Sequence, residues 1–217
     1  MKRALITGIT GQDGAYLAKF LINKGYTVFG TYRRLSTPNF WRLHYLQIFD
    51  KVKLIPGDII DSSSVAQALE KSNPDEIYHL AAQSFVDVSF NQPLYTGDIT
   101  GFGAVRILEQ LNKFNKKIKF YQASSSEMFG VEKTLLKDEK TPFHPVSPYG
   151  VAKVYAFWMV NMYRKIYGIH ASNGILFNHE SPIRGLEFVT RHVSNEVAKI
   201  SLGLSKEVHL GNLEAKR

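Results

Sequence analysis

The 217-residue chain contains no cysteine, which excludes disulfide bonds and thiolate metal sites and favours a reducing compartment such as the cytoplasm. It also lacks any apolar run close to the ~20 residues that a membrane-spanning helix needs. The apolar stretch after Lys2 and Arg3 ends at Gly8, which is too early for the core of a secretory signal. We therefore expect a cytoplasmic protein that makes no membrane contact.

Internal repeats, low-complexity tracts and long linkers are also missing from the sequence. Hydrophobic residues make up 44% and charged residues 21%, which is ordinary for a soluble globular protein. A chain of this length can bury one sizeable core and carry a small appendage. No group of His, Asp and Glu has metal-ligand spacing, so we expect no metal site.

Basic residues outnumber acidic residues, with 27 Lys and Arg against 19 Asp and Glu, and the net charge is +8. An excess of this kind can indicate nucleic-acid binding. Here the basic residues are spread along the chain in short clusters such as Lys116-Lys117, and no zinc-finger or single-strand-binding signature accompanies them. We therefore expect no nucleic-acid partner, and a pocket for anionic ligands would account for part of the excess.

Short apolar runs alternate with amphipathic helical segments along the chain. Strands are expected at residues 3–7, 26–32, 52–55, 76–80, from 119 to 122, 171–177 and 208–210. Helices are expected after Gly14, after the cap at Asp61, and at residues 93–115, 148–167 and 188–202. This alternation predicts an α/β fold with a doubly wound parallel sheet, the dinucleotide-binding Rossmann fold. We expect it to occupy residues 1–175, with a second, incomplete domain beginning at residues 176–217.

A glycine-rich turn joins the first expected strand to the first expected helix. Gly8, Gly11 and Gly14 have the spacing G-x-x-G-x-x-G. Glycines let the backbone approach a pyrophosphate, and the start of the helix offers free N–H groups and a partial positive charge. A glycine pattern alone indicates only a tight turn, but the strand before it and the helix after it favour a dinucleotide site.

The end of the second expected strand bears on the choice of cofactor. An enzyme that uses NAD carries an acidic residue there for the ribose 2′-hydroxyl, whereas this chain has Arg33 and Arg34. Two guanidinium groups suit a 2′-phosphate and predict NADP, unless they are simply exposed. Asp58, after the third strand, can accept a hydrogen bond from the adenine amino group. The small residues among 81–84 would let the chain pass under the cofactor.

Tyr149 and Lys153 lie four residues apart, on one face of an expected helix. A phenol normally titrates near pH 10 and is a poor base at neutral pH. The lysine ammonium and the positive nicotinamide ring should lower the tyrosine pKa, so that Tyr149 takes a proton from a hydroxyl as hydride leaves the same carbon. Taken alone, the spacing Tyr-x-x-x-Lys is common, and in most proteins it consists of a surface tyrosine and a solvent-exposed lysine.

A serine-rich segment precedes this pair, at the end of the expected fifth strand. Ser124, Ser125 and Ser126 are followed by Glu127, and both Ser125 and Glu127 can project into one pocket. An elimination needs a second base, which Glu127 can supply. The alternative is an ordinary loop acid. His79, within the fourth strand, is expected to be a core histidine rather than a ligand.

Together these features resemble the extended short-chain dehydrogenase/reductase family, and the finer likeness is to the GDP-mannose 4,6-dehydratases. The likeness rests on residues 4–14, 32–34, 81–84, 120–130, 142–153, 174–185, 188–191 and 210–217. It implies a hydro-lyase that converts GDP-mannose to GDP-4-keto-6-deoxymannose and water with a recycled NADP. It also implies a homo-oligomer, either a dimer or a tetramer.

The resemblance also implies roles for individual residues. Tyr149 would deprotonate the C4 hydroxyl, and Ser125 would hydrogen-bond to the C4 oxygen. Glu127 would remove the C5 proton and assist loss of the C6 hydroxyl, while Lys153 would hold the nicotinamide ribose and lower the tyrosine pKa. The implied cofactor-binding residues are Gly8, Gly11, Gln12, Asp13, Gly14, Arg33, Arg34, Asp58, Ile59, Leu80, Ala81, Ala82, Gln83, Ser84, Tyr95, Lys153, His179 and Arg184. The implied substrate-binding residues are Ser84, Ser125, Glu127, Tyr149 and Asn178.

Some positions depart from the family pattern. Leu35-Ser36 replaces a usual pair of serines, and His192 stands where the family tends to carry Lys. Family members continue well past Arg217, so the resemblance implies a fragment or a truncated relative that turns over poorly. Alternative functions are another nucleotide-sugar dehydratase or epimerase, an inactive dinucleotide-binding module, and a basic nucleic-acid binder without motif support.

Overall fold

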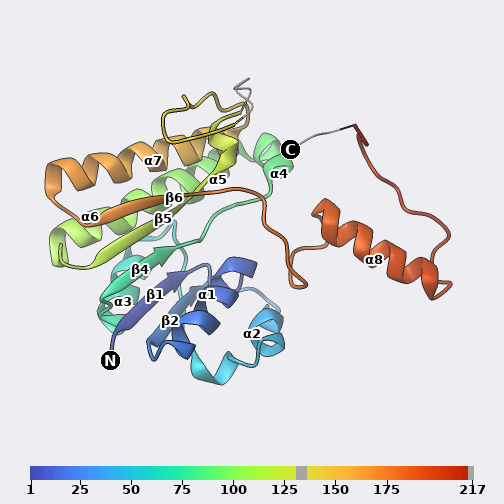
Figure 1. Cartoon of the computed structure of the whole chain (residues 1–217). Coiled ribbons are helices and arrows are strands. Elements are labelled where there is room, and N and C mark those ends of the chain that lie inside the picture. Colours follow the sequence, from blue (N-terminus) through green and yellow to red (C-terminus); the bar gives the residue numbers. More distant parts are fainter. Residues whose placement is uncertain (131–135, 215–217) are drawn as a thin grey trace. The chain divides into compact units, whose positions relative to one another are not determined.

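The computed structural model describes residues 1–130 and 136–214. The chain divides into two compact units, Met1–Phe177 and Asn178–Arg217 (Figure 1). The segment 210–217, one of those that carry the family resemblance, ends in residues 215–217, which lie outside the described part.

The first unit is built on a parallel sheet of six strands in the order β3-β2-β1-β4-β5-β6 (Figure 1). This order reverses direction between β1 and β4, and ligands of such sheets bind at the carboxyl ends of the strands near the reversal. The doubly wound parallel sheet predicted from the sequence is therefore confirmed. The strands are β1 Arg3–Thr7, β2 Thr27–Tyr32, β3 Lys53–Pro56, β4 Glu76–His79, β5 Lys119–Ser125 and β6 Ala171–Leu176.

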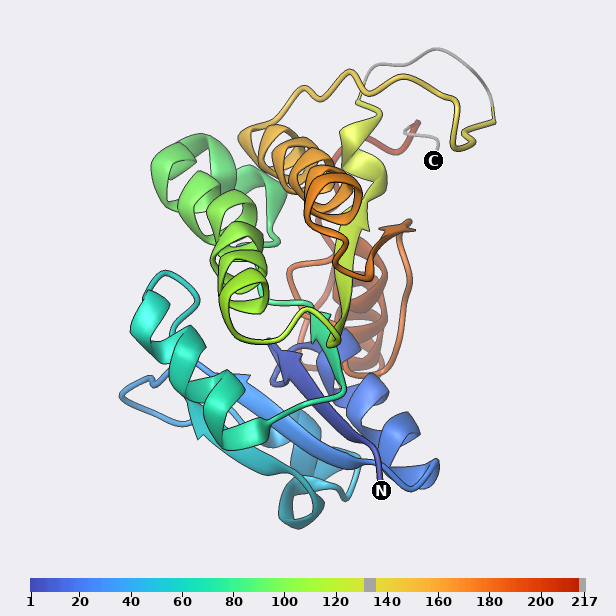
Figure 2. The ribbon, with the colours of Figure 1, turned by 90° about the vertical axis from the view of Figure 1, so that its left-hand side faces the viewer.

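Helices cover both faces of the sheet. Figure 2 shows α3, α6 and α7 on one face and α1 on the other. The α-helices of the first unit are α1 Gln12–Asn23, α2 Trp41–Tyr45, α3 Ser62–Ser72, α4 Val86–Asn91, α5 Pro93–Thr96, α6 Gly103–Phe114 and α7 Pro148–Tyr167. Short turns of other helix types lie at η1 Phe49–Lys51, η2 Gly97–Phe102 and η3 Ser126–Met128.

The main core lies between the sheet and the face formed by α3, α6 and α7. Alternate strand residues point to this face because successive side chains of a strand point to opposite sides. Burying each large apolar side chain stabilises the fold by roughly 1.5–3 kcal/mol. The cluster includes the strand residues Leu5, Phe29, Ile55, Ile77 and Phe120 and the helix residues Val65, Leu69, Ile107, Leu108, Leu111 and Val160.

Helix ends follow the local sequence closely. The Asp61 carboxylate caps α3 by accepting hydrogen bonds from the backbone N–H groups of Ser63 and Ser64 at 3.0 and 3.1 Å. Pro148 occupies the first turn of α7, and Gly168 ends that helix in a left-handed conformation with φ of +71°. These signals explain why both helices begin where the sequence predicts.

Several sequence-based expectations are corrected by the structure. Residues 93–115 do not form one α-helix, because the π-helical segment η2 separates α5 from α6. Residues 208–210 form no strand, since no described strand pairs with them and a strand needs a hydrogen-bonded neighbour. Strand β5 runs on to Ser125, and α2 and α4 were not anticipated.

The second unit contains helix α8, Val189–Ser201, of which no residue is buried within the chain. Its local contacts are polar. Lys199 Nζ lies 2.8 Å from Glu196 Oε1, and His192 Nε2 lies 3.2 Å from the His209 carbonyl oxygen. His192, which departs from the family pattern, therefore contacts the backbone that follows α8.

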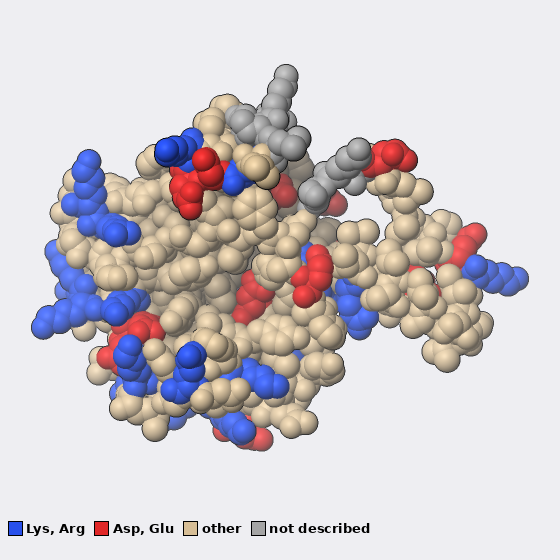
Figure 3. All heavy atoms as spheres, viewed as in Figure 1, with Lys and Arg blue, Asp and Glu red and all other residues tan. Residues whose placement is uncertain are grey.

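The surface shows how charge and apolar area are distributed. Lys and Arg side chains are scattered in separate groups over the visible face and alternate with Asp and Glu (Figure 3). An exposed apolar stripe runs along α7, formed by Val151, Tyr155, Trp158 and Ile166. Among the described helices, none is long and apolar enough to cross a membrane.

Candidate active site

Tyr149 lies in the first turn of α7 and is buried within the chain, with a relative exposure of 8%. The Ser147 hydroxyl caps this helix by accepting a hydrogen bond from Gly150 N at 3.0 Å. A side chain at Gly150 would place its Cβ 2.7 Å from the Glu127 carbonyl oxygen. The lack of a side chain at this position therefore lets the segment that carries Glu127 pack against the start of α7.

Lys153 follows one turn later on α7 and is only 3% exposed. Its ammonium donates a hydrogen bond to the Ala123 carbonyl oxygen at 2.6 Å and lies 5.6 Å from the centroid of the Tyr149 ring. Burial lowers the pKa of Lys153 to about 8, while the Asp13 carboxylate opposes this shift. The structure thus places the two predicted residues together, with an ammonium that loses its proton easily.

Ser125 and Glu127 complete the group at the carboxyl end of β5. The Ser125 hydroxyl lies close enough to the Tyr149 phenol to lower its pKa through hydrogen bonding, and the Ser125 oxygen accepts a hydrogen bond from Glu127 N at 3.2 Å. The negative charge of Glu127 is close enough to Tyr149 to raise the phenol pKa. All four residues that the sequence predicted to be catalytic therefore lie around one point.

The ionisation of Tyr149 depends on its surroundings in the fold. Burial raises the pKa of Tyr149 to about 12, while the Ser125 hydrogen bond lowers it and the carboxylates of Glu127 and Asp13 raise it further. Lys153 is not among the groups that lower this pKa in the chain without cofactor, and its expected effect together with a bound nicotinamide stays a prediction. Lys153 titrates near pH 8 and is therefore neutral at the pH where Tyr149 ionises.

The glycine-rich turn forms a close-packed cradle at the start of α1. Gly8 has a φ of +74°, and a Cβ there would lie 2.8 Å from Ala81 N. A Cβ at Gly14 would lie 2.4 Å from the Gly8 carbonyl oxygen. Gly11 is the N-cap of α1 and no side chain caps this helix, so its first N–H groups suit an anionic ligand. Gln12 and Asp13 lie in the same turn of the helix.

The loop after β4 contains the predicted contacts Leu80, Ala81, Ala82, Gln83 and Ser84. Leu80 N donates to the Thr7 carbonyl oxygen at 3.2 Å, and Ala81 N donates to the Thr7 hydroxyl at 3.2 Å. Gln83 N donates to the Thr100 hydroxyl at 3.2 Å. Thr100 belongs to the π-helical segment η2, and sequence reasoning missed it because nothing in the sequence marked that segment.

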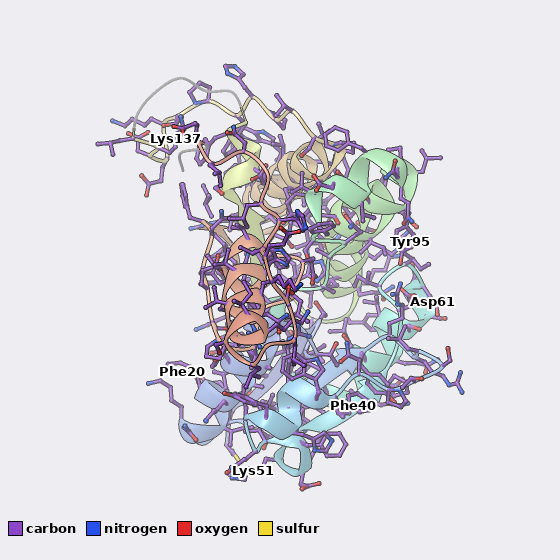
Figure 4. The ribbon with its side chains drawn as sticks, turned by 90° about the vertical axis from the view of Figure 1, so that its right-hand side faces the viewer. Phe20, Phe40, Lys51, Asp61, Tyr95 and Lys137 are labelled. Carbon is purple, nitrogen blue, oxygen red and sulfur yellow. The ribbon has the colours of Figure 1, made fainter. Side chains whose placement is uncertain are left out.

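Arg33 and Arg34 are both exposed just beyond the carboxyl end of β2. The Arg33 guanidinium donates a hydrogen bond to the Tyr95 hydroxyl, which comes from α5. In Figure 4, Tyr95 and the cap residue Asp61 both lie on the right-hand side of the view. Two predicted cofactor residues, 62 positions apart, are thus brought into contact.

A pocket lies at the carboxyl ends of β1, β2 and β3, with about 330 Å³ of empty space including its open mouth. The predicted adenine residues Asp58 and Ile59 line it together with Thr7 and Thr31. Asp58 Oδ1 accepts a hydrogen bond from Ile60 N at 3.2 Å, which fixes the carboxylate. The glycine-rich turn and this pocket both lie at the carboxyl edge of the sheet, which is where dinucleotides bind to folds of this kind.

Asn178, His179 and Arg184 belong to the second unit. Arg184 Nε lies 3.0 Å from Glu180 Oε2, and Arg184 Nη1 donates to the His179 carbonyl oxygen at 2.5 Å. The Arg184 guanidinium also lies 4.0 Å from the centroid of the Phe188 ring. These contacts fix the local turn in which the three predicted residues lie.

The parallel sheet, the glycine-rich turn and the Ser125–Tyr149–Lys153 group define a nucleotide-binding domain of the short-chain dehydrogenase/reductase type. The family model of GDP-mannose 4,6 dehydratase matches residues 5–217, and the chain belongs to this family.

Curated relatives support the same family. The chain is 48% identical over 224 residues to GDP-mannose 4,6-dehydratase of Yersinia enterocolitica, and 51% identical over 223 residues to that of Vibrio cholerae. It is 49% identical over 222 residues to the human GDP-mannose 4,6 dehydratase. The alignments cover 99–100% of this chain, and the chain spans about 60% of the length of each of these relatives.

Solved structures share the fold. UDP-glucose 4-epimerase from Brucella ovis in complex with NAD has a TM-score of 0.72 at 25% identity, over 82% of this chain and 52% of that one. The dTDP-glucose 4,6-dehydratase from Bacillus anthracis, in complex with NAD, has a TM-score of 0.78 at 22% identity, over 91% and 62%. RMD from Pseudomonas aeruginosa, complexed with NADPH, has a TM-score of 0.73 at 24% identity, over 94% and 63%.

Proposed function

We propose that this chain carries the catalytic centre of an NADP-dependent GDP-mannose 4,6-dehydratase. The observation that carries the proposal is the position of Glu127, two residues after Ser125 and close enough to influence the ionisation of Tyr149. A dehydrogenase or an epimerase needs only the tyrosine, the lysine and the cofactor. A carboxylate at the same point supplies the second base that an elimination requires.

When bound, NADP would supply the acceptor for the hydride from C4 of the sugar and the source of the hydride that C6 receives. Tyr149 takes the proton of the C4 hydroxyl, and Ser125 orients the phenol through its hydrogen bond. Glu127 then takes the C5 proton, which the new ketone makes acidic, and passes a proton to the departing C6 hydroxyl. Lys153 supplies positive charge one helical turn from Tyr149.

The preference for NADP over NAD is supported by the end of β2. Arg33 and Arg34 stand where an acidic residue would bind the ribose 2′-hydroxyl. The Tyr95 hydroxyl accepts a hydrogen bond from Arg33 and holds its guanidinium at the carboxyl edge of the sheet. A planar guanidinium can donate two parallel hydrogen bonds to a phosphate, so this arrangement favours a 2′-phosphate.

Asn178, His179 and Arg184 lie in the second unit, and their predicted roles, Asn178 for the sugar nucleotide and His179 and Arg184 for the cofactor, are part of this proposal. Residues 176–217 would then begin a substrate-binding domain, as the sequence predicted. The family membership and the identity of about half of all aligned residues to GDP-mannose 4,6-dehydratases support this assignment. We place the protein in the cytoplasm, because a chain without cysteine forms no disulfide bonds and needs no oxidising compartment.

Assembly with a second copy of the chain is supported by the apolar stripe on α7. Trp158 is 60% exposed and lies at the middle of the stripe. A contact between two copies of one helix about a two-fold axis buries the same stripe on both sides. The side chains of the stripe are uncharged, while Arg164 and Lys165 lie exposed beside Ile166 at its end.

The decisive experiment measures the product formed from GDP-mannose and NADP. Two proteins are compared: the 217-residue chain, and a chimaera in which the remaining part of the Vibrio cholerae relative follows Arg217. A dehydratase yields a keto sugar nucleotide that has lost one water, which mass spectrometry detects. An epimerase would yield an isomer of unchanged mass. An isomer, or NADP binding without product in the chimaera, would overturn the proposal.

A further inference from the structure

Three polar side chains are buried side by side beneath the candidate site. Thr7 on β1 pairs in register with His79 on β4, and His79 pairs with Gln122 on β5. His79 and Gln122 are each 1% exposed, and Thr7 is also buried. All three face the side of the sheet that α6 and α7 cover, because each lies two residues after a core residue (Leu5, Ile77 and Phe120) and side chains two apart on a strand share a face. Buried polar groups need hydrogen-bond partners, so their pairing must be specific.

Hydrogen bonds of Thr7 bear on which nitrogen of His79 carries the proton. The Thr7 oxygen accepts the hydrogen bond of Ala81 N at 3.2 Å, and its own hydrogen can be donated. His79 Nδ1 lies 2.6 Å from that oxygen, and which of the two groups donates depends on the tautomer of His79. A neutral imidazole that accepts at Nδ1 carries its proton on Nε2.

His79 stays neutral in this environment. Burial lowers the pKa of His79 to about 3, and the nearby positive charge of Lys153 adds to the effect. His79 Nε2 is buried and has no hydrogen-bond partner among the described residues. In the tautomer that accepts at Nδ1, the ring presents one buried N–H donor that needs an acceptor.

Gln122 presents the complementary group. Its amide nitrogen donates to the Ala123 carbonyl oxygen at 3.1 Å, which leaves its Oε1 atom as a buried acceptor without a partner among the described residues. The Ala123 carbonyl also accepts the hydrogen bond of the Lys153 ammonium. Gln122 is thus connected to Lys153 through a shared acceptor.

We propose that His79 Nε2–H pairs with Gln122 Oε1 across β4 and β5, and that His79 and Gln122 are positioning residues for the cofactor site. The two residues pair in register on neighbouring strands, about 5 Å apart, so their side chains lie next to each other on one face of the sheet. The link completes a hydrogen-bond chain from Ala81 N, through Thr7 and the pair, to the Ala123 carbonyl and Lys153. This inference rests on the proposed function, because that proposal gives Ala81 and Lys153 their contacts with NADP.

The test observes His79 directly by nitrogen NMR of histidine-labelled chain at neutral pH. We expect Nε2 to be protonated, Nδ1 to be an acceptor, and the Nε2–H resonance to move in a Gln122→Met variant. In Gln122→Met the dissociation constant for NADP should rise roughly 3–10-fold, as expected for one lost hydrogen bond between neutral groups. A Thr7→Val variant should move the proton towards Nδ1, whereas Thr7→Ser should keep it on Nε2.

Ser72→Ala is the matched control. Ser72 is fully buried in α3 and its hydroxyl donates to the Ala68 carbonyl oxygen at 2.6 Å, without any link to Lys153. This variant should lower thermal stability and leave both the His79 resonance and NADP binding unchanged.

Either of two results would overturn the inference: a proton on Nδ1 in the unaltered chain, or a His79 resonance and an NADP affinity that do not respond to Gln122→Met. The unaltered chain and Thr7→Ser keep the test valid if Gln122→Met does not fold. If the His79 resonance responds but the unaltered chain does not bind NADP, the pairing stands while its positioning role falls with the proposed function.

Discussion

The Lys153 ammonium lies 5.6 Å from the centroid of the Tyr149 ring, and its hydrogen bond goes to the Ala123 carbonyl oxygen rather than to the phenol. Burial disfavours the charged form of both residues. It lowers the pKa of Lys153 to about 8 and raises the pKa of Tyr149 to about 12, because each charged form loses its hydration. Both side chains are therefore neutral over a wider pH range in the folded chain than in water.

Replacing Lys153 with Met should stabilise the chain in the absence of cofactor. The folded pKa of about 8 lies below the ordinary 10.5, so below pH 8 folding forces a charged lysine into a buried site. Allowing for the lost bond to Ala123, the gain at pH 7 should be roughly 1–3 kcal/mol of unfolding free energy, measured by urea denaturation. The gain should shrink as the pH rises from about 8 to about 10.5.

Lys165→Met serves as the control for this measurement, because Lys165 lies exposed on the same helix. This substitution should change stability little. A Lys153→Met chain less stable than the original at pH 7 would show that burial does not penalise the Lys153 charge.

Glu127→Gln should separate oxidation at C4 from loss of water. The amide keeps the shape of the side chain but cannot act as a base, so dehydration should slow by roughly 10²–10⁴-fold while NADP binding is spared. The assay uses the chimaera with GDP-mannose deuterated at C5. The chimaera that retains Glu127 should exchange the label with solvent, and the Glu127→Gln variant should not.

Glu139→Gln is a suitable control for Glu127, because Glu139 is an exposed acid outside the site. It should leave isotope exchange and product formation unchanged. If Glu127→Gln still exchanged the label and formed product at the normal rate, Glu127 would be a bystander and the dehydratase assignment would lose its physical basis.

Changing both Arg33 and Arg34 to Gln should remove the preference for NADP. Each guanidinium that contacts a 2′-phosphate contributes a charge-assisted hydrogen bond, so NADP affinity should fall roughly tenfold or more while NAD affinity changes little. Dissociation constants for both cofactors are measured at one fixed salt concentration. Lys116→Gln with Lys117→Gln removes the same charge from an exposed loop before β5 and should affect both cofactors equally. Equal binding of NAD and NADP by the original chain would contradict the assignment.

Asp61→Ala should lower the melting temperature by removing the cap of α3. Hydrogen bonds from Ser63 and Ser64 lower the pKa of Asp61 from 3.8 to about 2. A lowered folded pKa means that the contribution is complete above about pH 4 and is lost as the pH falls towards 2. The difference between the two chains, followed by thermal melting, should therefore narrow on acidification. Asp61→Asn should keep most of the cap, and a constant difference at all pH values would contradict this account.

Trp158→Glu should weaken self-association. The change places a charge in the middle of the apolar stripe on α7, where a two-fold contact would bury it twice. Molar mass is measured by light scattering or sedimentation across a range of protein concentrations. Phe20→Glu, on the exposed side of α1, is the control and should leave the mass unchanged. A chain that is monomeric without any substitution would remove the basis for the prediction.

Much of the fold could be predicted because short sequence patterns mark where its helices and strands begin and end. Pro148, Ser147 and Gly168 mark the ends of α7, and the alternation of apolar runs marks six of the strands. The same reasoning failed for residues 208–210, where the apolar residues Val208 and Leu210 suggest a strand. Periodicity describes one segment at a time, whereas a strand exists only with a neighbour to pair with.

The sequence by itself determined the class of protein, because the glycine-rich turn, the arginines after β2 and the Tyr149–Lys153 spacing are local patterns with a direct chemical meaning. Only the tertiary structure decided the ionisation of that site and the pairing possibilities of His79 and Gln122. These depend on burial and on contacts between strands far apart in the chain. The physical reason is that desolvation and hydrogen bonding act across space, so a pKa follows from all the groups that surround a residue and not from its neighbours in sequence.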